Sequence, residues 1–292
     1  MPQTFAQRLK AALTSSGSLV CVGLDPEPAK FPNDLGEDAT RLHAFDRRVI
    51  DATYDIAAAY KPQIAFYSAL GAENQLALTI RYIRERAPNA LVILDAKRGD
   101  IGNTAEAYVR EAFDRYGADA VTVNPYMGED SVRPFLARKD RGALVLCRTS
   151  NSGGKDFQNL ILDGLPLYRH VARRATGPWN QFDNVMLVVG ATAPKEMAEL
   201  RAAHPDVTFL VPGIGAQNGD LNAVLDAGLD AQGTGLLISA SRSIIYAGGG
   251  TAAAIRAAAV QLHQEINAER SVKRPRDGIA YRAVSTGTEF NL

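Results

Sequence analysis

Short apolar runs alternate with segments of helical periodicity along most of this chain. The runs are rich in Val, Ile and Leu, which is typical of strands buried on both faces of a sheet. We predict strands at residues 19–24, 60–66, 91–94, 120–124, 142–147, 184–189, 207–211 and 233–238. Between the runs, apolar residues recur every three or four positions, which predicts helices. The predicted helices are 38–59, 73–86, 103–116, 129–137, 164–176, 194–203, 220–227 and 251–266.

Eight strands, each followed by a helix, predict an α/β fold with a parallel sheet. Eight such units in roughly 250 residues favour a (β/α)8 TIM barrel, and the chain lacks a G-x-G-x-x-G motif after its first strand, which disfavours a dinucleotide-binding sheet. We see no interdomain linker, so residues 1–292 are predicted to form one domain, with the barrel at about 17–266. An N-terminal capping helix is predicted at 5–13. Residues 267–292 have no strong period and are predicted to be a C-terminal extension.

Composition indicates which kinds of partner and which cellular compartment to expect. Lys plus Arg and Asp plus Glu both number 32, so bulk charge does not favour a nucleic-acid or membrane partner. Cys21 and Cys147 lie within apolar runs without metal-ligand spacing, which indicates buried free thiols in a reducing compartment. The first residues lack an apolar signal core, and no run reaches 18 apolar residues. We therefore expect a soluble, cytoplasmic protein.

Four charged residues stand at the ends of neighbouring predicted strands. Asp95 and Lys97 follow an apolar run and share one side of the strand, roughly 6–7 Å apart, and Asp100 lies in the next turn. Lys61 lies inside the apolar run at 60–66. Because active sites of TIM barrels are built at the carboxyl ends of the strands, the four charges would alternate in sign around the barrel mouth. The alternatives are a solvated turn with exposed ion pairs and a lysine that extends its ammonium to the surface.

The last two strand-end loops indicate an anion site. Gly213 and Gly215 would allow backbone amides to approach a ligand closely, and Gln217 and Arg242 add side-chain donors. Loops after the seventh and eighth strands commonly bind phosphate in this fold. The alternative is that the glycines serve tight turns and Arg242 is a surface charge. The other polar residues at strand ends are Asp25, Asn124, Thr149, Ser150 and Asn151.

The segment Asp95-Ala-Lys-Arg-Gly-Asp-Ile-Gly-Asn-Thr104 resembles the signature of the orotidine 5′-phosphate decarboxylase family. The resemblance spans residues 19–246. The residues of the motif and the length of the chain resemble those of the longer-chain, mainly bacterial subfamily. Five further segments match in order: Cys21-Val-Gly-Leu-Asp-Pro, Lys61-Pro-Gln-Ile-Ala-Phe, Arg148-Thr-Ser-Asn-Ser-Gly, Pro212-Gly-Ile-Gly-Ala-Gln and Ser241-Arg-Ser.

This resemblance implies decarboxylation of orotidine 5′-monophosphate to uridine 5′-monophosphate in de novo pyrimidine biosynthesis, without a cofactor or a metal. It implies that Lys97 protonates C6 of the pyrimidine, that Asp95 lies beside the departing carboxylate, and that Lys61 and Asp100 complete the charged network. It also implies a homodimer with shared active sites. The implied substrate-binding residues are Asp25 and Lys61 for the ribose, Ser150 for the pyrimidine, Gly215, Gln217 and Arg242 for the phosphate, and Asp100 and Thr104 reaching into the other subunit's site. Which of Thr149, Ser150 and Ser152 contacts the base stays open.

Three rival hypotheses remain. Metal-dependent sugar-phosphate decarboxylases or aldolases share an Asp-x-Lys-x-x-Asp motif, but they typically have an acidic residue where this chain has Lys61. A Schiff-base aldolase needs a neutral lysine, which Asp95 and Asp100 oppose. A catalytically silent phosphate-binding protein would have no need for charges at every strand end.

Overall fold

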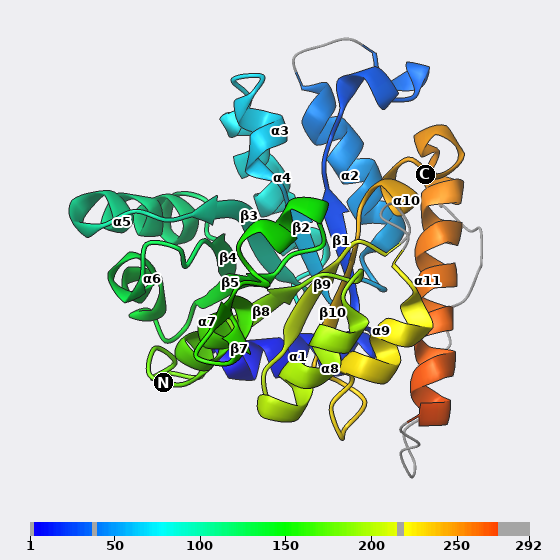
Figure 1. The fold of residues 1–292 in the computed structure, drawn as a ribbon. Helices are drawn as coiled ribbons and strands as arrows, with labels where there is room; N and C mark the ends of the chain where they lie inside the picture. Colours follow the sequence, from blue (N-terminus) through cyan, green and yellow to red (C-terminus); the bar gives the residue numbers. More distant parts are fainter. Residues whose placement is uncertain (1–2, 37–39, 215–218, 274–292) are drawn as a thin grey trace.

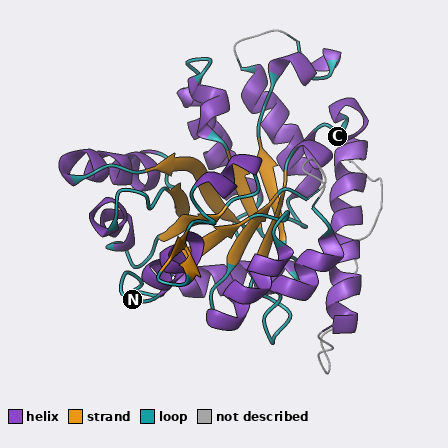
Figure 2. Ribbon diagram, viewed as in Figure 1, coloured by secondary structure: helices purple, strands orange, loops and turns teal. Residues whose placement is uncertain are grey.

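A closed barrel of eight parallel strands forms the centre of the molecule (Figures 1 and 2). The computed structural model describes residues 3–36, 40–214 and 219–273. The strands follow one another around the barrel in the order β1, β10, β9, β8, β5, β4, β3, β2. Their bounds are Val20–Leu24 (β1), Ala59–Pro62 (β2), Leu91–Arg98 (β3), Ala120–Val123 (β4), Gly142–Arg148 (β5), Val185–Val189 (β8), Phe209–Pro212 (β9) and Leu236–Ala240 (β10). The predicted TIM barrel is confirmed.

Buried strands explain the near-continuous apolar runs. In β1, Val20, Val22 and Leu24 pack outward against the surrounding helices, whereas Cys21 belongs to a second cluster inside the barrel. Both faces of each strand are thus covered, as expected for a parallel sheet. Cys21 and Cys147 are buried and free, as predicted.

Helices surround the barrel on all sides. Helices α4 (Glu73–Arg86) and α8 (Pro194–Ala203) begin and end at the predicted residues. Within the described residues, no helix combines the length and the hydrophobicity that crossing a membrane requires. The remaining helices are α1 (Phe5–Ser16), α2 (Arg41–Thr53), α3 (Ile64–Ser68), α5 (Gly102–Val109), which continues as a π-helical segment at Arg110–Arg115, α6 (Glu129–Leu136), α7 (Leu167–Thr176), α9 (Leu221–Gly228), α10 (Arg242–Ile245) and α11 (Ala252–Lys273).

Several predicted boundaries are wrong. Helix α2 ends at Thr53 rather than at residue 59, and residues 64–66 belong to α3 rather than to the second strand. The eighth strand begins at Leu236, because Gly233 and Gly235 adopt positive φ angles that a strand does not use. Helix α11 continues to Lys273, seven residues past its predicted end.

A short hairpin replaces the predicted start of α7. Strands β6 (Ile161–Leu162) and β7 (Leu165–Pro166) pair antiparallel across Asp163 and Gly164. Both turn residues have positive φ angles, 49° and 77°. An Asp-Gly pair is a strong signal for such a two-residue turn, so the sequence did carry this information.

Helix α1 covers the end of the barrel opposite to the carboxyl ends of the strands (Figure 1). Thr4 and Gln7 form a capping box that begins the helix. Phe5 then packs against Gly142 at the start of β5, where a Cβ atom would overlap the Phe5 ring. The predicted N-terminal capping helix is confirmed, and it closes the inner apolar cluster against water.

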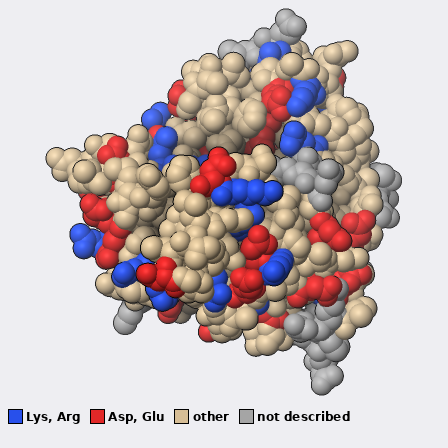
Figure 3. Space-filling view, viewed as in Figure 1, with Lys and Arg blue, Asp and Glu red and all other residues tan. Residues whose placement is uncertain are grey.

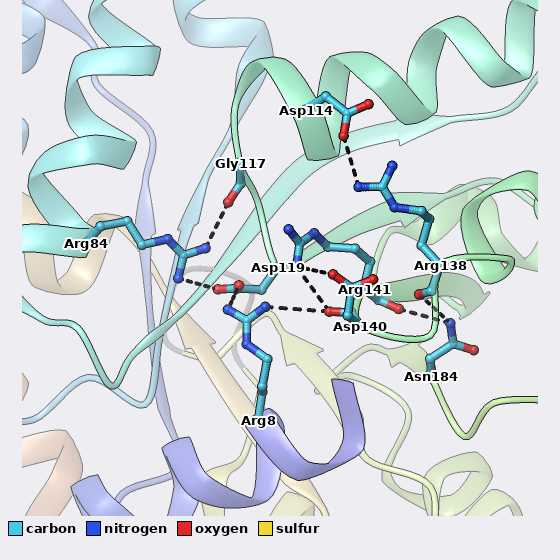
Figure 4. Close-up of polar contacts among 9 residues, drawn as sticks. All are labelled: Arg8, Arg84, Asp114, Gly117, Asp119, Arg138, Asp140, Arg141 and Asn184. Atoms are coloured by element: carbon cyan, nitrogen blue, oxygen red, sulfur yellow. Dashed lines mark hydrogen bonds and ion pairs between the residues drawn. The ribbon is translucent and has the colours of Figure 1, made fainter. Parts of the chain in front are cut away.

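An ion-pair network lies at this closed end (Figure 4). Asp119, which is fully buried, accepts from Arg8, from Arg84 at 2.7 Å and from the backbone N–H of Val92 at 2.7 Å. Arg141 lies next to this group and pairs with Asp140 at 2.9 Å. The network ties α1 and α4 to the start of β4.

Candidate active site

The centre of the candidate site is the Asp95 carboxylate, which lies between two lysines at the mouth of the barrel. Lys61 Nζ donates to one oxygen at 2.8 Å, and Lys97 Nζ donates to the other at 2.6 Å. The Asp95 and Lys61 side chains are 9% and 7% exposed, whereas Lys97 is 48% exposed. The Asp95–Lys61 pair is therefore buried, and the Lys97 side chain bound to it is accessible at the barrel mouth.

Strand pairing brings these residues together. A bridge between Gln63 and Asp95 aligns the ends of β2 and β3, and Lys61 pairs with Gly23 of β1. The structure confirms the predicted proximity of Lys61, Asp95 and Lys97: Lys61 lies in β2 and the other two lie in β3, near the carboxyl ends of strands that meet at one edge of the barrel.

The charges of this cluster stabilise one another. Burial alone would raise the pKa of Asp95, but Lys61 and Lys97 outweigh burial and hold that pKa well below its ordinary value. Burial would lower the pKa of Lys61, but Asp95 and Asp25 outweigh it and raise that pKa. Asp95 and Lys61 are therefore both ionised at neutral pH. Burial raises the pKa of the neighbouring Cys21 thiol to about 12, so this cysteine is no nucleophile.

A threonine on β4 adds a further contact to the cluster. Thr122 Oγ1 donates to Asp95 at 2.9 Å and accepts from the backbone N–H groups of Ala96 and Lys97, both at 2.9 Å. The apolar spacing of the sequence does not single out this residue. A polar residue inside the apolar run at 120–123 was the available signal.

Asp25 leaves β1 beside Lys61. One of its carboxylate oxygens is buried and has no hydrogen-bond partner in the described part of the chain. Its carbonyl oxygen accepts from the Tyr246 hydroxyl at 2.8 Å, and the same hydroxyl accepts from the Glu27 N–H at 2.6 Å. The backbone at Asp25 is thus fixed, while its side chain retains an unused acceptor.

Asp100 and Thr104 make no polar contact with the cluster among the described residues. Asp100 is half-buried, and it accepts from the backbone N–H of Ile101 at 2.8 Å. Thr104 is exposed on α5. Among the described residues, no hydrogen bond or ion pair joins either of them to Asp95 or its lysines. Three of the four predicted charges therefore come together within one subunit.

Ser150 lies at the exit of β5 and packs closely against β8. A Cβ at Gly190 would come within 2.6 Å of Ser150, so glycine is required there. Next to it, the buried Arg148 donates to the Thr149 carbonyl at 2.7 Å and approaches Glu196 at 3.4 Å. This arrangement holds the loop that carries Ser150 near the mouth.

The two loops of the predicted anion site lie side by side. Ser239 of β10 pairs with Pro212 of β9, and Gly213 follows with a φ of 107°. A Cβ at Gly23 would overlap the Ser241 side chain, so glycine in β1 lets this loop approach. Arg242 begins α10 and is exposed. Gly215 and Gln217 lie outside the described residues.

The charged side chains around Asp95 do not form a metal site in the described part of the chain. Both oxygens of Asp95 are engaged by ammonium groups, and the described residues contain no group of three His, Cys, Asp or Glu side chains that could hold a metal ion. The prediction that the reaction uses neither a metal nor a cofactor stays a prediction.

A protein-family model described as the orotidine 5′-phosphate decarboxylase / HUMPS family matches residues 18–258. This chain belongs to that family. The matched residues include the whole barrel, from β1 to β10, so the family resemblance inferred from the motifs is confirmed.

Relatives of the decarboxylase family agree in length as well as in sequence. Orotidine 5′-phosphate decarboxylase of Cellvibrio japonicus (strain Ueda107) is 53% identical over 273 residues, covering 92% of this chain and all of that protein. The protein of the same name from Janthinobacterium sp. (strain Marseille) is 55% identical, covering 84% of this chain and 90% of that one. The structure of Leishmania donovani OMP decarboxylase is 44% identical with a TM-score of 0.82, covering 92% of this chain and 99% of that one.

Proposed function

We propose that this enzyme decarboxylates orotidine 5′-monophosphate to uridine 5′-monophosphate and CO2, as the names of its relatives indicate for those proteins. The observation that carries the proposal is the Lys97 ammonium held on the Asp95 carboxylate at the barrel mouth. This activity belongs to de novo pyrimidine biosynthesis, and we infer that the enzyme acts in the cytoplasm.

Loss of CO2 from C6 of the pyrimidine leaves a carbanion whose orbital lies in the plane of the ring and is not conjugated with it. Groups already in place must stabilise the developing charge. Lys97 supplies a positive charge that stabilises the developing carbanion, and after CO2 has left it transfers a proton to C6. Asp95 keeps the ammonium in position and lies beside the departing carboxylate. Lys61 in turn keeps Asp95 ionised.

One charge pair is not sufficient for such a reaction. Two unit charges about 4 Å apart contribute roughly 4 kcal/mol at an effective dielectric constant near 20. Large enzymatic rate enhancements correspond to roughly 20 kcal/mol. Binding energy from the distant phosphate must therefore also be used in the transition state.

We assign the rest of the substrate as follows. The unused oxygen of Asp25 can accept a hydrogen bond from a ribose hydroxyl, next to Lys61. Ser150 contacts the pyrimidine from the β5 loop. Arg242 binds the phosphate together with Gly215 and Gln217, the loop residues that lie outside the described part of the chain.

We further propose that the enzyme is a homodimer whose subunits meet at the site. The loops after β3, β4 and β5 carry large exposed apolar side chains, which monomeric proteins rarely gather in one place. Tyr126 is 80% exposed, Phe157 59% and Ile101 51%, and the Tyr126 and Phe157 rings lie 6.4 Å apart. Asp100 precedes Ile101 directly. A partner that covers this surface would bring Asp100 and Thr104 of each subunit toward the site of the other.

Loss of orotidine 5′-monophosphate absorbance is the direct test of the activity. We expect the wild type to be active and Lys97→Ala to lose about 10²-fold to 10⁴-fold in kcat, because the proton donor is missing. The same variant should still bind the product uridine 5′-monophosphate. Lys10→Ala, which alters an exposed lysine on α1 at the opposite end of the barrel, is the matched control and should keep full activity. An inactive wild type, or an active Lys97→Ala variant, contradicts the proposal.

A further inference from the structure

Strand β3 contains an irregularity at the site, opposite Thr122. Leu94 pairs with Val121, and Arg98 pairs with Val123. Three residues of β3, Asp95 to Lys97, therefore face the single residue Thr122 of β4. Such a bulge interrupts the ladder of backbone hydrogen bonds and redirects side chains.

The Thr122 hydroxyl forms the hydrogen bonds that the backbone of β4 does not form at this bulge. Thr122 is 1% exposed, and its hydroxyl accepts from the backbone N–H groups of Ala96 and Lys97. A hydroxyl has two lone pairs and one proton. Since both lone pairs are used, the proton is directed to Asp95, which accepts it at 2.9 Å. The one donor and the two acceptor positions of the Thr122 hydroxyl are thus all used in hydrogen bonds to Asp95, Ala96 and Lys97.

Lys97 needs such support. Its φ of +49° lies in the left-handed region, where side chains with a Cβ are strained. The other non-glycine residues with positive φ in the described chain are Asp163 and Asp183, a residue type that tolerates this region. A strained lysine at a site persists only when its surroundings fix it. The backbone of Lys97 is fixed by the Thr122 hydroxyl, and its ammonium is fixed by Asp95.

We propose that Thr122 is a positioning residue for Lys97, an inference that rests on the proposed function. Through its hydroxyl, it holds the backbone of Lys97 in the left-handed conformation and orients the Asp95 carboxylate that receives the Lys97 ammonium. Thr122 is not expected to touch the substrate, because its hydroxyl is already saturated.

The kinetic test compares Thr122→Val, which removes the hydroxyl and keeps the shape, with Thr122→Ser, which keeps the hydroxyl. Misplacement of a reacting group by about 1 Å can cost about 10²-fold in rate. We expect Thr122→Val to lower kcat between about 10-fold and 10²-fold with KM changed less than about 3-fold, and Thr122→Ser to recover kcat to within about 3-fold of wild type.

Thr53→Val is the matched control. Thr53 is also fully buried in α2; its hydroxyl donates to the Val49 carbonyl at 2.7 Å and lies 2.9 Å from the Tyr60 hydroxyl, and within the described chain it makes no hydrogen bond to Asp95 or Lys97. This variant should lose stability comparably and keep its kcat. A Thr122→Val enzyme with wild-type kcat, or a Thr122→Ser enzyme as slow as Thr122→Val, overturns the proposal.

A second readout does not depend on the activity. Competitive labelling with acetic anhydride, followed by mass spectrometry, reports the reactivity of Lys97 relative to the exposed Lys10. We expect Lys97 to react at least about 3-fold faster in Thr122→Val than in wild type or Thr122→Ser, because its ammonium is no longer held on Asp95. Unchanged labelling overturns the inference. Failure of the wild type to decarboxylate the substrate would instead contradict the proposed function, and labelling would still test the role of Thr122.

Discussion

Asp46 is a buried carboxyl group that the candidate site does not use. It lies on α2, where one oxygen accepts from Tyr67 at 2.7 Å and from Thr79 at 2.9 Å, while the other is buried without a partner in the described chain. Burial raises the pKa of Asp46 from 3.8 to about 7, against the smaller opposite effects of Tyr67 and Thr79. Charge on Asp46 is therefore costly near neutral pH, unlike charge on Asp95, which has two lysines beside it.

This difference predicts how stability changes with pH. A carboxyl group with a raised pKa in the folded state binds its proton more tightly there. Its contribution is fully present below pH 3.8 and is lost as the pH rises toward about 7. At about 1.4 kcal/mol per pKa unit, the loss amounts to at most about 4 kcal/mol.

Asp46→Asn removes this titration. Urea unfolding at pH 5 and pH 7.5 should show a smaller fall in unfolding free energy with pH for Asp46→Asn than for wild type. Since the amide keeps an acceptor oxygen for Tyr67 and Thr79, any other loss should be similar at both pH values. Parallel pH dependences in the two proteins would refute the assignment.

At the scale of elements, helix α1 depends on a buried carboxylate at the closed end of the barrel. Asp119 faces Arg8 and Arg84, with Arg141 close by, so three guanidinium groups gather around it (Figure 4). Burial, then the charges of Arg8 and Arg141, lowers the pKa of Arg84 to about 10. The arginines thus repel one another, and Asp119 compensates for their charge.

Asp119→Asn should therefore destabilise the fold strongly. Removing one partner of a buried ion pair costs about 3–5 kcal/mol, because the remaining charges are left uncompensated. The control is Asp114→Asn, whose partner Arg138 lies in an exposed pair at 2.9 Å and whose loss should cost less than about 1 kcal/mol. Both are measured by urea unfolding, and equal effects would contradict the difference in burial. The folded Asp119→Asn enzyme should retain its kcat, since the site lies at the other end of the barrel.

The spacing of apolar residues predicts helices and strands correctly where a single periodicity dominates. Helices α4 and α8 and the order of all eight strands follow from apolar spacing alone. The pattern failed where tertiary contacts decide: residues 64–66 read as strand but form α3. Lys61, Asp95 and Lys97 could be found because strand ends converge in any parallel barrel. Thr122 could not be singled out in the same way, because its role depends on an irregular register between β3 and β4.

The surface of the described residues mixes charges of both signs, and exposed apolar side chains stand on the loops after β3, β4 and β5. Acidic and basic side chains are interspersed over the face shown in Figure 3, in keeping with a formal net charge of zero. The loops after β3, β4 and β5 expose Ile101, Tyr126 and Phe157, and Asp100, which directly precedes Ile101, makes no hydrogen bond or ion pair with Asp95, Lys61 or Lys97 among the described residues. In the proposed homodimer, Asp100 of a second copy would complete this site.

Mixing two inactive variants tests whether Asp100 of one subunit acts in the site of the other. Lys97→Ala and Asp100→Ala each disable a different contribution to a shared site. In hybrid dimers one site receives both defects and the other receives neither. With equal amounts and full subunit exchange, we expect about one quarter of wild-type activity. No recovery, with exchange verified by mass spectrometry of labelled subunits, would show that Asp100 acts within its own subunit.

Closure of the barrel also has a consequence for synthesis on the ribosome. The first strand, β1, pairs with the last, β10, through Val20 and Ile238, which lie more than two hundred positions apart in the sequence. Until β10 has emerged, β1 retains an unpaired strand edge, which is prone to association with other chains. Such non-local pairing is slow to form. The last step of folding therefore waits for nearly the whole chain, and a nascent chain cut short before Leu236 would remain an open sheet.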